Sequence, residues 1–207
     1  SEAMGMNMVT IATDSINQLI ERKTKVKCLS ISGNFCIDKK PAWLNFLSGR
    51  GKRVWAEVIL KKEVVKEVLK TTPEKFFDVW LGKCIIGSAM SGSLGFNSHF
   101  ANIVAAFFAA TGQDLAHVVE GSMGITTSKV LKNGDLYVSV YLPAVMIGTI
   151  GGGTKLKTKQ EALSIIGVKN SVELAEVLGG AVLAGEISLL ASLAEGSLSK
   201  THQKLGR

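Results

Sequence analysis

The sequence has few of the residues that stabilise small secreted domains or stack on nucleic-acid bases. Its 207 residues include three cysteines, three prolines and only 6% aromatic residues. The cysteines lack C-x-x-C spacing, and an odd number without a signal peptide favours a reducing, intracellular compartment. The three tryptophans lie in apolar stretches, and no aromatic residues alternate with basic ones, which argues against nucleic-acid binding.

Long uncharged apolar runs are also absent. The longest candidate for a membrane span, residues 177–194, is interrupted by glycines and by Glu186, so we expect a soluble, cytoplasmic protein with no membrane partner. With 46% hydrophobic and 20% charged residues, the chain has enough apolar surface for a core. Its net charge of +7 favours anionic partners. Charge alone does not choose among nucleic acid, anionic membranes and phosphate-bearing cofactors.

Helices and strands are mixed without a regular βαβ alternation, which predicts an α+β fold. Apolar spacing predicts helices over residues 9–22, 42–47, 62–70, 100–110, 159–168 and 171–194, and another that begins at Pro73. Period-two alternation predicts strands over residues 25–31, 52–60 and 136–142, the last preceded by an Asn-Gly-Asp turn. Two glycine-rich segments, residues 87–99 and 147–154, predict tight turns and close backbone approach.

The segment Asp38-Lys39-Lys40-Pro41 places two ammonium groups beside a carboxylate. A lysine in this setting can polarise a carbonyl group and hold a developing oxyanion. Spacing alone is more typical of a solvated charged turn. Asp114 has a similar pair of interpretations, because it can cap the helix that follows or pair with a catalytic lysine.

The three histidines show no metal-ligand spacing with cysteines or carboxylates, so no metal site is predicted. His99, at the edge of an apolar helix, is typical of a hydrogen-bonded core histidine. His202 lies in the terminal tail, as either an unconstrained surface residue or a proton donor on a closing flap. Residues 147–154, IGTIGGGT, resemble phosphate-binding loops in composition only, without a G-x-G-x-x-G or Walker pattern.

Six segments, taken in order, resemble the catalytic region of class I hydroxymethylglutaryl-CoA reductases. They are residues 2–8 (EAMGMNM), 32–41 (SGNFCIDKKP), 87–90 (GSAM), 112–114 (GQD), 147–154 (IGTIGGGT) and 200–202 (KTH). The resemblance covers almost the whole chain. It implies NADPH-dependent reduction of hydroxymethylglutaryl-CoA to mevalonate and free CoA, in the pathway to isoprenoids.

The resemblance also implies a role for each matching residue. Lys39 would stabilise the oxygen of the reacting carbonyl, Asp114 would hydrogen-bond that lysine, and His202 would protonate the departing thiolate. The substrate would be bound by Ser32, Asp38, Lys40, Lys83, His99 and Asn102. NADPH would be held by Met4, Gly5, Met6, Asn7, Met8, Thr149, Gly151, Gly152, Gly153 and Thr154. A cis peptide bond between Cys36 and Ile37 is implied as well.

The implied architecture has three parts. Residues 1–30 would end a small ferredoxin-like NADPH-binding domain and residues 31–42 would form the catalytic loop. Residues 43–207 would belong to a mainly helical large domain that binds substrate and dimerises, with a flexible tail from about residue 198. The active site would lie between the subunits of a homodimer or larger assembly, with no nucleic-acid partner.

Two departures from the family pattern matter. The family's catalytic portion is about twice as long, and the glutamate of its E-N-V-I-G motif has no counterpart in this chain. Glu2 stands where the family usually has aspartate. The absent glutamate leaves a second hypothesis, a catalytically incomplete fragment that acts as a cofactor-binding and oligomerisation module. The chain also stops before the regulatory serine of animal members, which favours an archaeal member.

Overall fold

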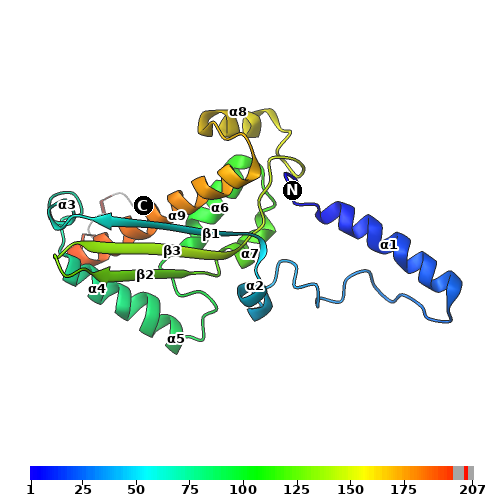
Figure 1. Ribbon diagram of the computed structural model, residues 1–207, viewed down its shortest axis with the longest axis horizontal. Coiled ribbons are helices and arrows are strands. Elements are labelled where there is room, and N and C mark those ends of the chain that lie inside the picture. Colours follow the sequence, from blue (N-terminus) through cyan, green and yellow to red (C-terminus); the bar gives the residue numbers. More distant parts are fainter. Residues whose placement is uncertain (198–202, 205–207) are drawn as a thin grey trace.

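The computed structural model describes residues 1–197 and 203–204 of the chain (Figure 1). In this part of the chain, three antiparallel strands form one sheet in the order β1-β3-β2. The strands are β1 (Arg50–Leu60), β2 (Ile125–Val130) and β3 (Leu136–Val145). The predicted Asn-Gly turn joins β2 to β3, with Gly134 at a positive φ of 87°. The mixture of this sheet with helices confirms the predicted α+β class.

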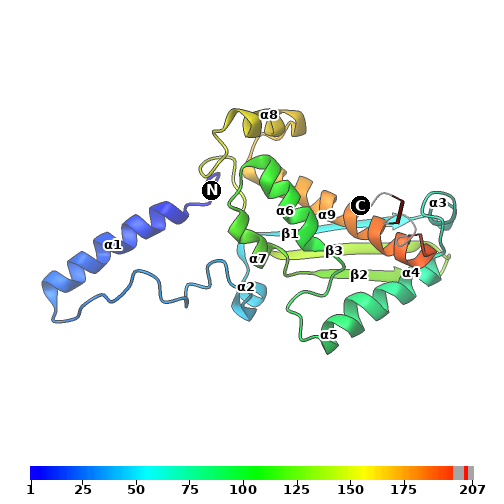
Figure 2. The ribbon, with the colours of Figure 1, turned by 180° about the vertical axis from the view of Figure 1, so that it is seen from behind.

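One face of the sheet is covered by α9 (Ser171–Glu195), α6 (Phe100–Thr111) and α4 (Pro73–Trp80), as Figure 2 shows. Alternate residues of β3 point towards these helices and are fully buried; they are Leu136, Val138, Val140 and Leu142. The core therefore lies between the sheet and the helix layer. Gly179 lets α9 approach β1 closely, since a Cβ atom there would lie 2.5 Å from Cγ1 of Val54.

Six further helices complete the described part of the chain, and all of them except α1 lie close to this core. They are α1 (Met6–Lys23), α2 (Trp43–Ser48), α3 (Lys62–Glu67), α5 (Ser88–Met90), α7 (Val118–Gly121) and α8 (Lys157–Ile166). Thr72 caps α4 by accepting a hydrogen bond from the amide of Lys75 at 3.3 Å, and Pro73 occupies the first turn as expected. A π-helical stretch, Leu81–Gly87, joins α4 to α5, and a 3-10 turn, Leu115–His117, leads into α7.

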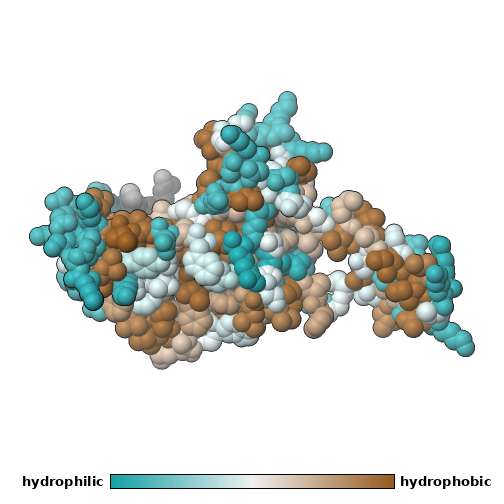
Figure 3. Space-filling view, viewed as in Figure 1, coloured by the Kyte–Doolittle hydropathy of each residue, from teal (hydrophilic) through white to brown (hydrophobic). Residues whose placement is uncertain are grey.

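An arm formed by α1 and the segment that follows it projects from this globule (Figures 1 and 3). The predicted strand over residues 25–31 is wrong. The structure assigns no strand there, and Leu29 is 99% exposed. A strand needs a hydrogen-bonded neighbour, and the arm passes no other strand. The arm also exposes apolar side chains of α1, which Figure 3 shows in brown; among them are Ile11, Ile16, Leu19 and Ile20.

The helix α9 is long and apolar enough to cross a membrane by length and composition, with a mean hydropathy of 1.8. This test admits charged residues, so it does not contradict the absence of a long uncharged apolar run. In the structure α9 lies against β1, β3, α4 and α6, and the central helix of a globular core passes the same test. Its buried Glu186 accepts hydrogen bonds from the amides of Ser98 and His99 and from the hydroxyl of Thr126. These bonds compensate for burial of a charge and tie α9 to β2 and to the start of α6.

Candidate active site

The loop that holds Lys39 has an irregular backbone. Ile37 and Lys39 have positive φ values of 54° and 56°, which non-glycine residues seldom adopt outside functional or tightly held segments. The buried amide of Asn45 fixes this backbone by donating to the carbonyls of Ile37 and Lys40, at 2.9 and 2.8 Å. The first turn of α2 and its surroundings therefore hold Lys39 in place.

The implied cis bond between Cys36 and Ile37 is not found, because the peptide bonds of the described residues are trans. Residues 31–36 are exposed in this chain, and Ile37 is only partly buried. A non-proline cis bond costs about 3 kcal/mol and persists only where surrounding structure enforces it. The trans geometry is consistent with the sparse packing around this part of the loop.

Lys39 and Asp114 meet although they are far apart in the sequence. The ammonium Nζ lies 2.9 Å from Oδ2 of Asp114. This hydrogen bond raises the pKa of Lys39 above its ordinary value and lowers the pKa of Asp114. The other carboxylate oxygen of Asp114 accepts from the amide of Ala116 at 3.0 Å. Asp114 therefore combines the two predicted interpretations, since it caps the turn and also pairs with the lysine.

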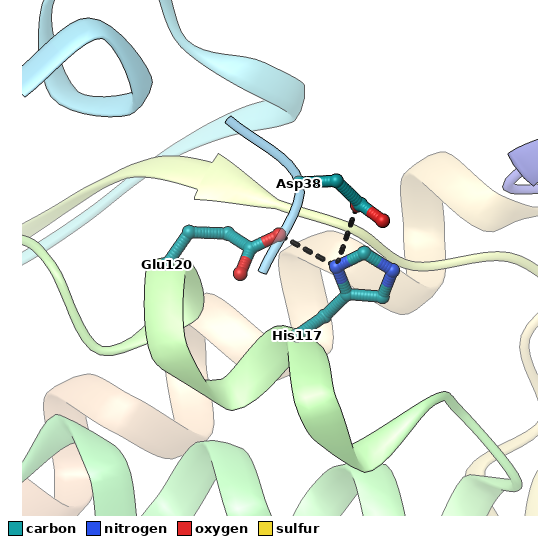
Figure 4. Close-up of side chains that lie close together, drawn as sticks. All are labelled: Asp38, His117 and Glu120. Atoms are coloured by element: carbon teal, nitrogen blue, oxygen red, sulfur yellow. Dashed lines mark hydrogen bonds and ion pairs between the residues drawn. The ribbon is translucent and has the colours of Figure 1, made fainter. Parts of the chain in front are cut away.

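A buried network lies directly behind this pair (Figure 4). His117 and Glu120 are fully buried, and the imidazole Nδ1 lies 2.5 Å from Oε1 of Glu120. Nδ1 is 3.8 Å from Oδ1 of Asp38, and Nε2 is 3.9 Å from Oδ2 of Asp114. Arg50 of β1 completes the network, with Nη2 3.0 Å from Asp38 and Nε 3.9 Å from Glu120.

Sequence reasoning missed His117, Glu120 and Arg50. The signal was the spacing of Asp114, His117 and Glu120, because residues three apart on a helical turn share one face. Single ligand atoms of Asp38, His117 and Glu120 lie within 4.8 Å of one another, close enough to share a metal ion. The guanidinium of Arg50 already provides positive charge there, so we interpret the cluster as an ion-pair network.

The expected cofactor segments meet around one cavity of about 550 Å³. Its wall is formed by Ala3, Met4, Gly5, Met6, Asn7, Met8, Gln113, Asp114, His117, Ile150, Gly151, Gly152 and Gly153. The structure thus brings eight of the ten predicted cofactor residues to the same wall as Asp114. That volume lies within the range of ordinary ligand sites.

Thr149 and Thr154, the other two, hold the glycine loop and do not line the cavity. Thr149 donates to the carboxylate of Glu2 at 2.9 Å, and Thr154 donates to the carbonyl of Gly151 at 2.6 Å. Gln113, which sequence reasoning did not single out, fixes the start of the loop through both ends of its amide. It donates to the carbonyl of Gly148 at 3.0 Å and accepts from the amide of the same residue at 2.9 Å.

Close packing of glycines places this loop against the end of α6. The amide of Gly153 donates to the carbonyl of Gly112 at 2.9 Å. Gly112 has a φ of 74°, and a Cβ atom there would lie 2.6 Å from the backbone of Gly153. The GQD segment therefore needs glycine at its first position, so that Gln113 and Asp114 can reach the cavity.

The expected substrate residues are divided between two places. Lys83 and His99 line a second cavity of about 640 Å³, to which the catalytic loop contributes Pro41. The ring of His99 also contacts the carbonyl of Gly185 at 2.8 Å, as expected for a hydrogen-bonded core histidine. Asn102 lies next to His99, its amide 3.4 Å from Nδ1, and does not line the cavity.

Three of the expected substrate residues belong to the loop itself. Asp38 is bound to Arg50, and Nζ of Lys40 lies 3.4 Å from the carbonyl of Asp38. Ser32 is exposed on the arm, with its hydroxyl 3.3 Å from Sγ of Cys36. Ser32 lines neither cavity in this chain. His202 lies outside the described residues.

Comparisons with known proteins agree with this arrangement. A family model described as hydroxymethylglutaryl-coenzyme A reductase matches residues 1–207. The chain is 52% identical to a 3-hydroxy-3-methylglutaryl-coenzyme A reductase of Pyrococcus abyssi, covering all of this chain and 53% of the relative. The chain is also 52% identical to the enzyme of the same name from Methanothermobacter thermautotrophicus, covering all of this chain and 52% of that relative. A plant relative from Hevea brasiliensis is 44% identical, with 38% of its length covered. The chain spans about half the length of the archaeal relatives.

Proposed function

Because the chain belongs to the hydroxymethylglutaryl-coenzyme A reductase family, we propose that it provides the lysine-bearing part of a reductase active site. The reaction is the NADPH-dependent conversion of hydroxymethylglutaryl-CoA to mevalonate and CoA. The observation that supports this proposal most directly is the Lys39–Asp114 pair at 2.9 Å, at the edge of a cavity formed by the cofactor segments.

The residues around the 550 Å³ cavity fit a dinucleotide. Glycines 151–153 bring bare backbone to one wall, where main-chain N–H groups can approach phosphate oxygens. Methionines of residues 4–8 supply adaptable apolar side chains to the same cavity. A bound nicotinamide dinucleotide would supply hydride to the substrate carbonyl. We propose NADPH as that cofactor, in agreement with the net charge of +7.

Lys39 has the properties that carbonyl reduction requires. Hydride addition to a carbonyl carbon leaves negative charge on its oxygen, and a fixed cation beside that oxygen stabilises it. The hydrogen bond with Asp114 raises the pKa of Lys39, so the ammonium form persists at neutral pH. The raised pKa also means that Lys39 holds its proton until a stronger base, such as the developing alkoxide, competes for it.

The other assignments are proposals of the same kind. Residues 1–30 would complete a ferredoxin-like cofactor domain, residues 31–42 the catalytic loop, and residues 43–207 the large domain. The second cavity, with Lys83 and His99, would bind the acyl part of the substrate. His202 would protonate the thiolate of CoA, and a cytoplasmic homodimer or larger assembly would share the site.

The test is NADPH oxidation with hydroxymethylglutaryl-CoA by the purified chain, compared with the Lys39→Ala variant. Turnover that disappears in the variant supports the reductase assignment. The absence of turnover in both, with NADPH still bound, would support the module hypothesis. The exposed apolar face of α1 favours that second candidate, because such a face is typical of an assembly surface.

A further inference from the structure

The imidazole of His117 lies between two carboxylates, with no solvent exposure. Its Nδ1 is hydrogen-bonded to Glu120, whereas Nε2 is directed towards Oδ2 of Asp114 at 3.9 Å. Nε2 has no hydrogen-bond partner among the described residues. A buried polar atom without a partner costs about 1–3 kcal/mol, so its orientation towards Asp114 calls for an explanation.

The charged groups around His117 explain this orientation of Nε2. Three carboxylates surround it: Glu120 from α7, Asp114 from the preceding turn and Asp38 from the catalytic loop. Two cations offset them, since Arg50 of β1 contacts Asp38 and Glu120, and Lys39 contacts Asp114. The cofactor segments of the cavity wall carry no charged side chain. Lys40, whose ammonium lies 3.4 Å from the carbonyl of Asp38, is a third cation nearby. A proton on Nε2 of His117 would let this unpartnered atom donate towards Asp114.

We propose, resting on the reductase function above, that His117 is a positioning residue that stores a proton for Lys39 and returns it through Asp114. In the resting site the imidazolium donates from Nδ1 to Glu120 and presents its second proton to Asp114. During reduction, hydride adds to the carbonyl carbon of the substrate, and Lys39 gives a proton to the carbonyl oxygen. The carboxylate of Asp114 then takes a proton from Nε2 of His117 and passes it to Lys39.

In total, the relay moves one proton from His117 to the substrate oxygen. The substrate oxygen gains it, His117 loses it, and Lys39 and Asp114 end as they began. Neutral His117 keeps its hydrogen bond to Glu120 through Nδ1, so the geometry of the site does not change. Solvent restores the proton through the partly exposed carboxylate of Asp114. Asp114 is suited to this transfer because it is partly exposed and touches both neighbours.

A spectroscopic test needs no turnover. Histidine labelled with ¹⁵N reports on each ring nitrogen of His117 in the unliganded chain at pH 7. We expect protonated values for both nitrogens, and a change of Nε2 towards the neutral value in Asp114→Asn, which keeps the shape but removes the charge. Tyr137→Phe, which removes a hydrogen bond at the far end of the sheet, serves as control. Identical His117 spectra in the wild type and Asp114→Asn would overturn the proposal.

A kinetic test addresses the relay itself. Glutamine at position 117 can keep a hydrogen bond to Glu120 but cannot give up a proton. We expect His117→Gln to lower kcat by about 10-fold or more, as for loss of a proton-transfer group, with KM changed less than about twofold. The solvent deuterium isotope effect on kcat should increase.

The outcomes separate this inference from the proposed function. An unchanged kcat in His117→Gln, or an effect on KM alone, would rule out the relay while leaving the reductase assignment intact. If the wild-type chain oxidises no NADPH, the reductase assignment fails, and the ¹⁵N spectra still decide whether His117 and Asp114 share a proton. Should His117→Gln fail to fold, the ¹⁵N spectra of Asp114→Asn provide the decision, since the side chain of Asp114 is partly exposed.

Discussion

At the scale of single residues, the ammonium of Lys39 is the group with the clearest chemical task. Its alanine variant should lose at least about 100-fold in kcat, the usual cost of removing a donor to a developing oxyanion. The fold should survive, because the side chain is more than one-third exposed. Steady-state NADPH oxidation and circular dichroism measure the two effects. Lys129→Ala, on the exposed side of β2, is the matched control; a Lys39→Ala enzyme as active as this control would show that Lys39 is not catalytic.

The same ion pair makes a prediction about stability and pH. The pKa of Asp114 is lowered from 3.8 in the folded protein. The stabilisation that its carboxylate gives to the fold is therefore present above pH 3.8 and is lost as the pH falls through the folded-state pKa. The pKa of Lys39 is raised from 10.5, so its contribution is lost only in strong alkali. Both side chains are more than one-third exposed, so solvent limits the pair to about 1 kcal/mol or less.

Urea denaturation of wild type and Asp114→Asn should therefore give unfolding free energies that differ by less than about 1 kcal/mol at pH 7. The difference should shrink as the pH falls below 3.8. Activity should decline far more than stability. A difference of several kcal/mol at neutral pH would mean that Asp114 is mainly a structural residue.

At the scale of elements, the contact between α9 and β1 offers a matched pair of glycines. A Cβ atom on Gly179 would lie 2.5 Å from Val54, whereas one on the neighbouring Gly180 would meet nothing within 4 Å. Gly179→Ala should thus destabilise the fold by about 1–3 kcal/mol through overpacking. Gly180→Ala should stabilise it by up to about 1 kcal/mol through helix propensity. Urea unfolding measures both, and equal effects would mean that α9 does not approach β1 closely.

The elements also show what the sequence could predict. Long periodic segments such as α6 and α9 were predicted well, because their burial is visible in local spacing. The strand predicted over residues 25–31 failed, and β2 was missed, because a strand depends on a partner that local pattern does not reveal. The buried network around His117 was not predicted, for the same reason. Asp38 reaches His117, and Arg50 reaches Asp38, only through the fold, whereas the segments that line the 550 Å³ cavity were expected together from their ordered resemblance to a family.

At the scale of the whole molecule, the two ends of the arm are fastened while its middle is exposed. Residue Glu2 binds the amide of Ser171 at 2.6 Å, and Arg50 binds the catalytic loop at the other end. Between these anchors, α1 has no buried residue. Exposed apolar side chains on one helix are costly in water and are commonly covered in an assembly. In the proposed homodimer, the second subunit would cover these apolar side chains of α1.

Light scattering should accordingly show a mass of at least twice the 22.0 kDa of one chain. Ile16→Glu should shift that mass towards the monomer, because it places a charge on the apolar side of α1. Ser15→Glu, at the neighbouring exposed position, should leave the assembly unchanged. If both variants assemble like the wild type, α1 is not the surface that joins the subunits. A wild-type chain that is monomeric at micromolar concentration would instead mean that α1 is covered by something other than a second copy.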